Sequence, residues 1–112
     1  MPHANLLLSE FALNVPVRVE RDGMSLVVIR LEGQIVAYED VCPHAYWPLS
    51  EGSVRDGVLE CPGHGWEFNA ESGRCLNAPS YCLTKISTVV DCEMIRLEWE
   101  AKPETARSLP CG

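Results

Sequence analysis

Two short boxes hold the residues in this chain that are best suited to metal chemistry. The first box is Cys42-Pro43-His44 and the second, sixteen residues further on, is Cys61-Pro62-Gly63-His64. Each box offers one thiolate and one imidazole, and four soft ligands divided between two similar loops are typical of a metal site. Such a set could hold a dinuclear iron–sulfur cluster, with the two cysteines on one iron and the two histidines on the other.

The same four residues, Cys42, His44, Cys61 and His64, could instead bind a structural zinc ion tetrahedrally. The first box is unusual for zinc, because two to four residues usually separate paired zinc ligands and only one separates Cys42 from His44. An iron–sulfur cluster absorbs visible light and zinc does not, so colour distinguishes these two hypotheses.

Tight loops between short strands must position these ligands. Pro43 and Pro62 fix the backbone beside a ligand, and Gly63 and Gly65 let the chain pass close to a bound group. Alternating or β-branched runs, separated by turn pairs such as Asp22-Gly23, predict strands. The predicted strands are 15–20, 25–31, 34–38, 53–55, 58–60, 66–68, 83–90 and 94–99. Many short strands predict an all-β fold, a small antiparallel sandwich or barrel, with the boxes in loops at one end.

Size and charge limit the possible functions. A chain of 112 residues fits a single domain, and we expect it to span residues 1–100, with the metal-binding subdomain at about 40–80 and a surface or disordered tail over 101–112. The net charge of −7 argues against nucleic acid and favours a protein partner with a basic surface. Five acidic residues near the boxes form either a steering rim or an ordinary solvated face: Glu39, Asp40, Glu51, Glu60 and Glu67.

The chain contains no apolar run of the roughly 20 residues needed to cross a bilayer. Its first residues also lack the pattern of a signal peptide, so we expect a cytoplasmic protein without a membrane partner. Reducing conditions favour metal roles over disulfides for the cysteines with histidine neighbours. Among the other cysteines, we expect Cys75, Cys82 and Cys92 to be small buried residues and Cys111 to be an exposed thiol in the tail.

Taken together, the two boxes resemble the Rieske family, and the wider pattern resembles the soluble Rieske-type ferredoxins of multicomponent oxygenases. The residues that carry the resemblance are Cys42-Pro43-His44, Pro48-Leu49-Ser50-Glu51-Gly52, Cys61 to Phe68, and the Ala78-Pro79 loop. It extends over roughly residues 6–98. It implies a Rieske [2Fe-2S] cluster with Cys42 and Cys61 on the inner iron, His44 and His64 on the outer iron, and Pro79 in a third loop that shields the cluster.

The resemblance also implies a function. The chain would be a monomeric one-electron carrier rather than an enzyme. It would accept electrons from a flavin-dependent NAD(P)H ferredoxin reductase and pass them to a terminal oxygenase of aromatic or related hydrocarbons. The small subunit of another oxidoreductase, such as a nitrite reductase, is the alternative within the family.

Two departures from the respiratory Rieske proteins predict a low reduction potential. Those proteins carry a disulfide at the positions of Trp47 and Gly63, and hydroxyl donors to the cluster sulfurs at the positions of Trp66 and Phe68. Neither Trp66 nor Phe68 has a hydroxyl to donate, which disfavours the reduced state. The aromatic Trp47 beside the first box either faces a docking partner or packs under the loop, and the sequence leaves both open.

Overall fold

The computed structural model describes residues 3–21, 23–42, 47–63, 65–77 and 81–99, and within them the chain forms strands and two short 3-10 turns. The elements in chain order are β1 His3–Leu7, η1 Leu8–Glu10, β2 Pro16–Arg21, β3 Met24–Leu31, β4 Gln34–Glu39, η2 Leu49–Glu51, β5 Ser53–Arg55, β6 Val58–Glu60, β7 Glu67–Asn69, β8 Lys85–Asp91 and β9 Met94–Glu98. The predicted all-β fold is confirmed.

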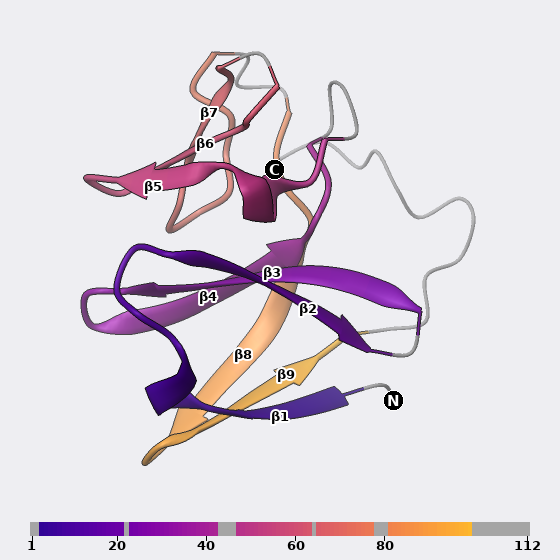
Figure 1. Ribbon diagram of the computed structural model, residues 1–112, viewed down its shortest axis with the longest axis vertical. Helices are drawn as coiled ribbons and strands as arrows, with labels where there is room; N and C mark the ends of the chain where they lie inside the picture. The colour runs from indigo at the N-terminus through magenta and orange to yellow at the C-terminus, as the bar shows by residue number, and fades with distance from the viewer. Residues whose placement is uncertain (1–2, 22, 43–46, 64, 78–80, 100–112) are drawn as a thin grey trace.

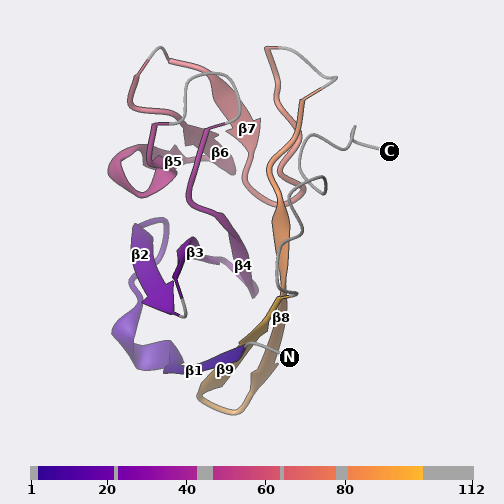
Figure 2. The ribbon, with the colours of Figure 1, turned by 90° about the vertical axis from the view of Figure 1, so that its right-hand side faces the viewer.

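Two antiparallel sheets make up the molecule. The larger has the strand order β1-β9-β8-β4-β3-β2 and curves into an almost closed barrel, and the smaller has the order β5-β6-β7. Figure 1 shows the small sheet above the large one, and Figure 2, turned by 90°, shows the same separation. The small sheet and the two box regions therefore form a subdomain at one end of the barrel.

Glycine-containing turns join the hairpins, as the sequence predicts. Gly33 between β3 and β4 and Gly57 between β5 and β6 have φ angles of 85° and 78°. This left-handed region carries no steric penalty for glycine, which is why the chain can reverse tightly there. The hairpin β5–β6 matches the predicted strands residue for residue, with Val54 opposite Leu59.

The first strand is an element that the sequence analysis did not predict. Residues 3–7 pair with β9 in antiparallel register, Ala4 opposite Leu97 and Leu6 opposite Ile95. Ala4 and Leu6 are buried while His3 is exposed, so the segment has the period-2 alternation of an edge strand.

The central strands β3 and β4 are buried on both faces and so contribute to two groups of core residues. Val27 and Ile29 point to the group that contains Cys42 and Cys61. Leu26 and Val28 point to the group shared with β1 and β9, which includes Trp99. The barrel thus packs against the small sheet and the two cysteines through the first of these core groups.

The remaining cysteines only partly follow the prediction. Cys75 is buried, as predicted, whereas Cys92 is exposed and Cys82 is half-buried. Cys92 occupies the β8–β9 turn with a φ of 56°, which places it at the surface despite its apolar character. Cys111, the tail 101–112 and the predicted Pro79 loop lie outside the described residues.

Tyr38 on β4 ties the barrel to the box subdomain. Its side chain is fully buried, and its hydroxyl donates a 2.6 Å hydrogen bond to the carbonyl of Ala70, just after β7. The ring also fills the space beside Gly73, where a Cβ would approach it to 2.8 Å. Burial, and secondarily the carboxylate of Glu71, raise the pKa of Tyr38 well above its ordinary value.

We expect Tyr38→Phe to lower the free energy of unfolding by about 1–3 kcal/mol near pH 7, because the buried Ala70 carbonyl loses its donor. The raised pKa adds a dependence on pH. The folded state holds the phenol proton more tightly than the unfolded chain, so the hydroxyl's contribution is complete below about pH 10 and declines as the pH rises further.

Chemical denaturation between pH 7 and 11 measures both effects. The difference between wild type and Tyr38→Phe should narrow at alkaline pH, and Tyr81→Phe, at an exposed site, is the matched control. A difference that stays constant with pH would contradict the assignment.

Candidate metal centre

The structure places the two predicted cysteine ligands together in the core. Cys42 and Cys61 have exposed fractions of 0% and 1% and belong to one group of buried residues with Leu49, Leu59 and Phe68. Both carry thiols rather than a disulfide. Two buried thiols in one apolar group are suited to a site where a metal keeps them deprotonated and shielded from water.

Each cysteine opens a loop that closes in the same way. The backbone N–H of Cys42 donates to the carbonyl of Trp47 at 2.8 Å, and the N–H of Cys61 donates to the carbonyl of Trp66 at 2.7 Å. In both cases the acceptor lies five residues after the cysteine, so the two segments have the same length, although the histidine follows its cysteine by two residues in the first and by three in the second. Among the described residues, the two boxes therefore share the same closing hydrogen bond, a similarity that the sequence only suggested.

The two loops are braced against each other at their bases. Gly52, which follows η2, lies so close to the backbone carbonyl of Glu60 that a Cβ would collide with it. Ser53 pairs with Glu60 in the β5–β6 hairpin. The residue just before the second cysteine is therefore held against the segment that follows the first loop, which explains the need for glycine at position 52.

The loops also touch near the surface, through Trp47 and Gly63. A Cβ on Gly63 would lie 2.8 Å from Cδ1 and Nε1 of the Trp47 indole, so the ring packs directly on this glycine. Trp47 nevertheless remains 47% exposed. One part of the ring therefore packs between the two loops and another part faces solvent, and the docking role stays a prediction.

The remaining predicted ligands, His44 and His64, lie outside the described residues. Within the part of the chain that the structure describes, no three histidine, cysteine, aspartate or glutamate side chains gather in a possible metal site. The fit can still be tested on the cysteines. Two thiols in equivalent loops, each followed by one histidine, form a donor set of two sulfurs and two nitrogens, which is the set that a Rieske [2Fe-2S] cluster requires.

The acidic residues around the boxes do not form one uniform rim. Glu51, Glu60 and Glu67 are exposed, but Asp40 is buried. Ser50 donates hydrogen bonds to both of its carboxylate oxygens, from the backbone N–H at 2.7 Å and from Oγ at 2.6 Å. Placing Asp40 in a solvated face was wrong, and the sequence offers little signal for its burial except its position two residues before Cys42.

Aromatic side chains cover the second loop on one side. Trp66 is half-buried against the core group that contains Cys61, and its ring centroid lies 5.6 Å from that of the exposed Tyr81. Trp66 therefore has a structural role, since it packs against the core and its backbone carbonyl closes the loop.

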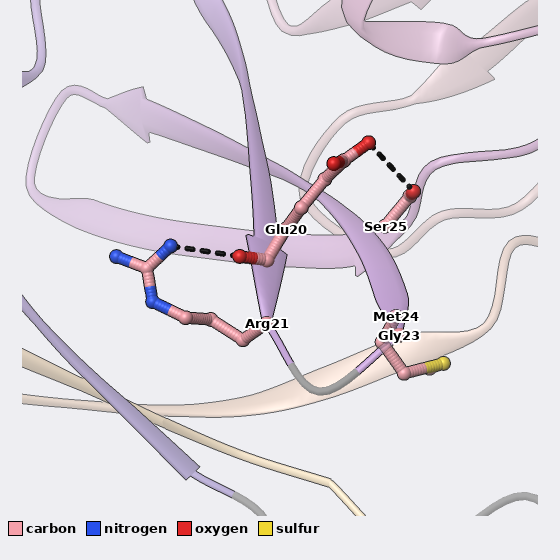
Figure 3. Close-up of a pocket in the computed structure, with 5 residues that line it drawn as sticks. All are labelled: Glu20, Arg21, Gly23, Met24 and Ser25. Carbon is pink, nitrogen blue, oxygen red and sulfur yellow. Dashed lines mark hydrogen bonds between the residues drawn. The ribbon is translucent and has the colours of Figure 1, made fainter.

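A pocket of about 260 Å³ lies away from the cysteines, on the β2–β3 hairpin (Figure 3). Its lining residues are Glu20, Arg21, Gly23, Met24 and Ser25. All of them come from one hairpin and none has a thiol or an imidazole, so we do not assign a metal site to this pocket.

Comparison with known proteins identifies the family. The model of the Rieske [2Fe-2S] domain matches residues 4–89. The ferredoxin component of the alkene monooxygenase system of Xanthobacter autotrophicus is 32% identical over 80 residues, which cover 70% of this chain and 66% of that protein. Protein TIC 55 of Arabidopsis thaliana is 52% identical over 48 residues, which are 43% of this chain but 9% of the relative.

Solved structures show the same fold. The complex of reduced oxygenase and oxidized ferredoxin in carbazole 1,9a-dioxygenase contains a chain with a TM-score of 0.75 and 32% identity, covering 82% of this chain and 96% of that one. A putative NADH-dependent nitrite reductase small subunit from Mycobacterium tuberculosis has a TM-score of 0.79 at 21% identity, covering 90% and 97%. The latter resemblance concerns the fold alone.

The chain spans about two thirds of the alkene monooxygenase ferredoxin and less than a tenth of TIC 55. Among the residues that the structure describes, there is no helix with the length and apolarity needed to span a bilayer. The family match over residues 4–89, together with the paired cysteine loops, leads to one conclusion: the chain belongs to the Rieske [2Fe-2S] domain family.

Proposed function

We propose that this protein is a Rieske ferredoxin, a one-electron carrier of an oxygenase system. The observation that carries the proposal is that Cys42 and Cys61 are both buried in one core group, and that each donates its backbone N–H to the carbonyl of the tryptophan five residues later. The likeness to ferredoxin components, including the alkene monooxygenase ferredoxin, supports an oxygenase as the electron acceptor. A flavin-dependent NAD(P)H ferredoxin reductase would be the donor, and hydrocarbon oxidation the purpose.

Four residues are proposed to hold the cluster: Cys42 and Cys61 on the buried iron, and His44 and His64 on the outer iron. When bound, a Rieske cluster stores and releases one electron at a time. The chain contributes burial of the two sulfur ligands, loops fixed by backbone hydrogen bonds, and two exposed aromatic side chains, Trp47 and Tyr81. The proposal includes a monomer in the cytoplasm, where nicotinamide-dependent reductases operate, with a domain over residues 1–100 and a separate tail.

Replacing a histidine ligand tests the ligand set. We expect His44→Ala and His64→Ala each to abolish or strongly alter the visible absorption and the electron paramagnetic resonance signal, because the outer iron would lose one of two nitrogen ligands. His3→Ala, at an exposed site in β1, is the matched control and should leave both spectra unchanged. A wild-type spectrum in either box variant would show that the assignment is wrong.

The reduction potential offers a second test, because it depends on residues near the cysteines. Histidine ligation raises the potential of Rieske centres to about −150 to +300 mV, since the imidazoles are neutral where thiolates would add negative charge. Phe68 is fully buried in the same core group as Cys42 and Cys61, and Trp66 packs against that group. Neither side chain brings a hydroxyl, so neither can stabilise added charge on a sulfur with an O–H donor.

We therefore expect a midpoint potential at the negative end of the Rieske range. A spectroscopic redox titration of the purified protein measures it. Phe68→Tyr should raise the potential if the new hydroxyl reaches a cluster sulfur, and Phe68→Leu serves as the control without a hydroxyl. A wild-type value near the top of the range would contradict this reasoning.

The exposed part of Trp47 indicates where a partner protein would contact the carrier. Exposed aromatic residues are common at the centres of interfaces, and this ring lies on the loop that carries one of the proposed ligands. We expect Trp47→Ala to slow electron transfer from the reductase or to the oxygenase several-fold.

Stopped-flow reduction kinetics measure that effect, with the cluster spectrum recorded for each variant. Met94→Ala is the matched control, because Met94 is 45% exposed and belongs to β9 of the large sheet rather than to the small sheet. Trp47→Phe should retain most of the rate by keeping an aromatic ring on Gly63. Unchanged kinetics in Trp47→Ala with a normal spectrum would exclude the docking role.

A further inference from the structure

Asp40 is the buried charged side chain among the residues that the structure describes. It follows β4 directly and precedes Cys42 by two residues, and its side chain has an exposed fraction of 0%. Burying a carboxylate is costly unless hydrogen bonds and an opposite charge compensate for the lost water. The partners of Asp40 therefore decide what this carboxylate does.

Its hydrogen bonds span the first cysteine loop. Ser50 donates from its backbone N–H to Oδ1 at 2.7 Å and from its hydroxyl to Oδ2 at 2.6 Å. Asp40 lies before the loop that runs from Cys42 to Trp47, and Ser50 lies after it, in η2. The backbone N–H of Asp40 also donates to the carbonyl of Ser25 on β3 at 2.9 Å. The carboxylate thus joins both ends of the loop, and the backbone N–H of Asp40 attaches this junction to β3 of the barrel.

The opposite charge that faces Asp40 is shared with another carboxylate. Arg18 on β2 approaches Oδ2 with Nη1 at 3.8 Å. The same guanidinium contacts Oε2 of Glu20 with Nε at 2.8 Å and with Nη2 at 2.7 Å. Nη2 also donates to Oγ of Ser25 at 3.1 Å, and Figure 3 shows the hydrogen bond that joins Ser25 to Glu20.

The side chains of Arg18 and Glu20 have exposed fractions of 46% and 62%, whereas that of Asp40 is fully buried. Water and salt screen the two exposed charges far more than the buried one. The neutral Ser50 hydrogen bonds orient the carboxylate without cancelling its charge. A negative charge that Arg18 offsets only in part is therefore held beside the first cysteine loop.

We propose that Asp40 is a positioning residue with an electrostatic role: it locks the first ligand loop through Ser50, and its buried charge keeps the reduction potential of the cluster low. The inference rests on the ligand set proposed above. Reduction adds one negative charge to the cluster, and a fixed carboxylate opposes that charge more strongly in a buried environment than in water. Asp40 thereby acts in the same direction as the missing hydroxyl donors at Trp66 and Phe68.

The test compares the midpoint potentials of three charge variants by redox titration, with no partner protein present. Asp40→Asn keeps the shape of the side chain and its acceptor for the Ser50 N–H but removes the charge, so its potential should shift to more positive values. Arg18→Met removes the compensating charge, so its potential should shift to more negative values, by less because Arg18 is half-exposed. Glu20→Gln, the exposed control, should shift by less than Asp40→Asn.

The opposite signs separate an electrostatic role from a purely structural one, because loosening the loop would not make the two shifts differ in sign. Raising the salt concentration should reduce the Arg18→Met shift and preserve most of the Asp40→Asn shift. Ser50→Ala retains the charge and loses the Oγ donor, so it should lower the thermal stability of the protein without a positive shift in potential.

An Asp40→Asn potential equal to wild type, or shifts of the same sign in Asp40→Asn and Arg18→Met, would overturn the inference. If Asp40→Asn does not retain the cluster, Arg18→Met decides alone, since a negative shift supports the inference and no shift refutes it. The proposed function fails separately: a carrier with these shifts that transfers no electrons to any oxygenase would refute the function and leave the role of Asp40 standing.

Discussion

The burial of two cysteine thiols, each in a loop closed by the same kind of backbone hydrogen bond, is the constraint on which the rest of the structure depends. The N–H of each cysteine donates to the carbonyl of the tryptophan five residues further on, so Cys42 and Cys61 occupy equivalent positions in their loops. Because both thiols are buried, contacts within the protein must hold the two loops in place. The barrel, the small sheet and the contacts between the loops provide that support.

Three contacts hold the loops in place, the first within one loop and the other two between the loops. Asp40 and Ser50 join the ends of the first loop beneath it, the close approach of Gly52 to the Glu60 carbonyl joins the bases of both loops, and the Trp47 ring rests on Gly63 near the surface. The last contact occupies the positions at which the respiratory relatives described above form a disulfide. Packing of an indole on a glycine needs no oxidation, so this arrangement can form in a reducing environment as well.

The same region also sets the electrostatics of the site. Aromatic and apolar side chains surround the thiols, and the hydroxyl of Tyr38 is committed to the Ala70 carbonyl rather than to the cysteines. The carboxylate of Asp40 adds a buried negative charge on the barrel side. The low potential proposed above follows from these features, and it would let the carrier deliver its electron readily to an acceptor of higher potential.

The sequence by itself determined the two cysteine–histidine boxes, the all-β class and most strand positions, because these depend on local residue types and on period-2 patterning. The β5–β6 hairpin was predictable to the residue, since Asp56-Gly57 specifies the turn without help from distant residues. Only the tertiary structure decided that residues 3–7 form a strand, because their partner β9 lies at the far end of the sequence. It likewise decided the burial of Asp40 and the contact of Trp47 with Gly63, since both depend on segments that meet only after the chain has folded.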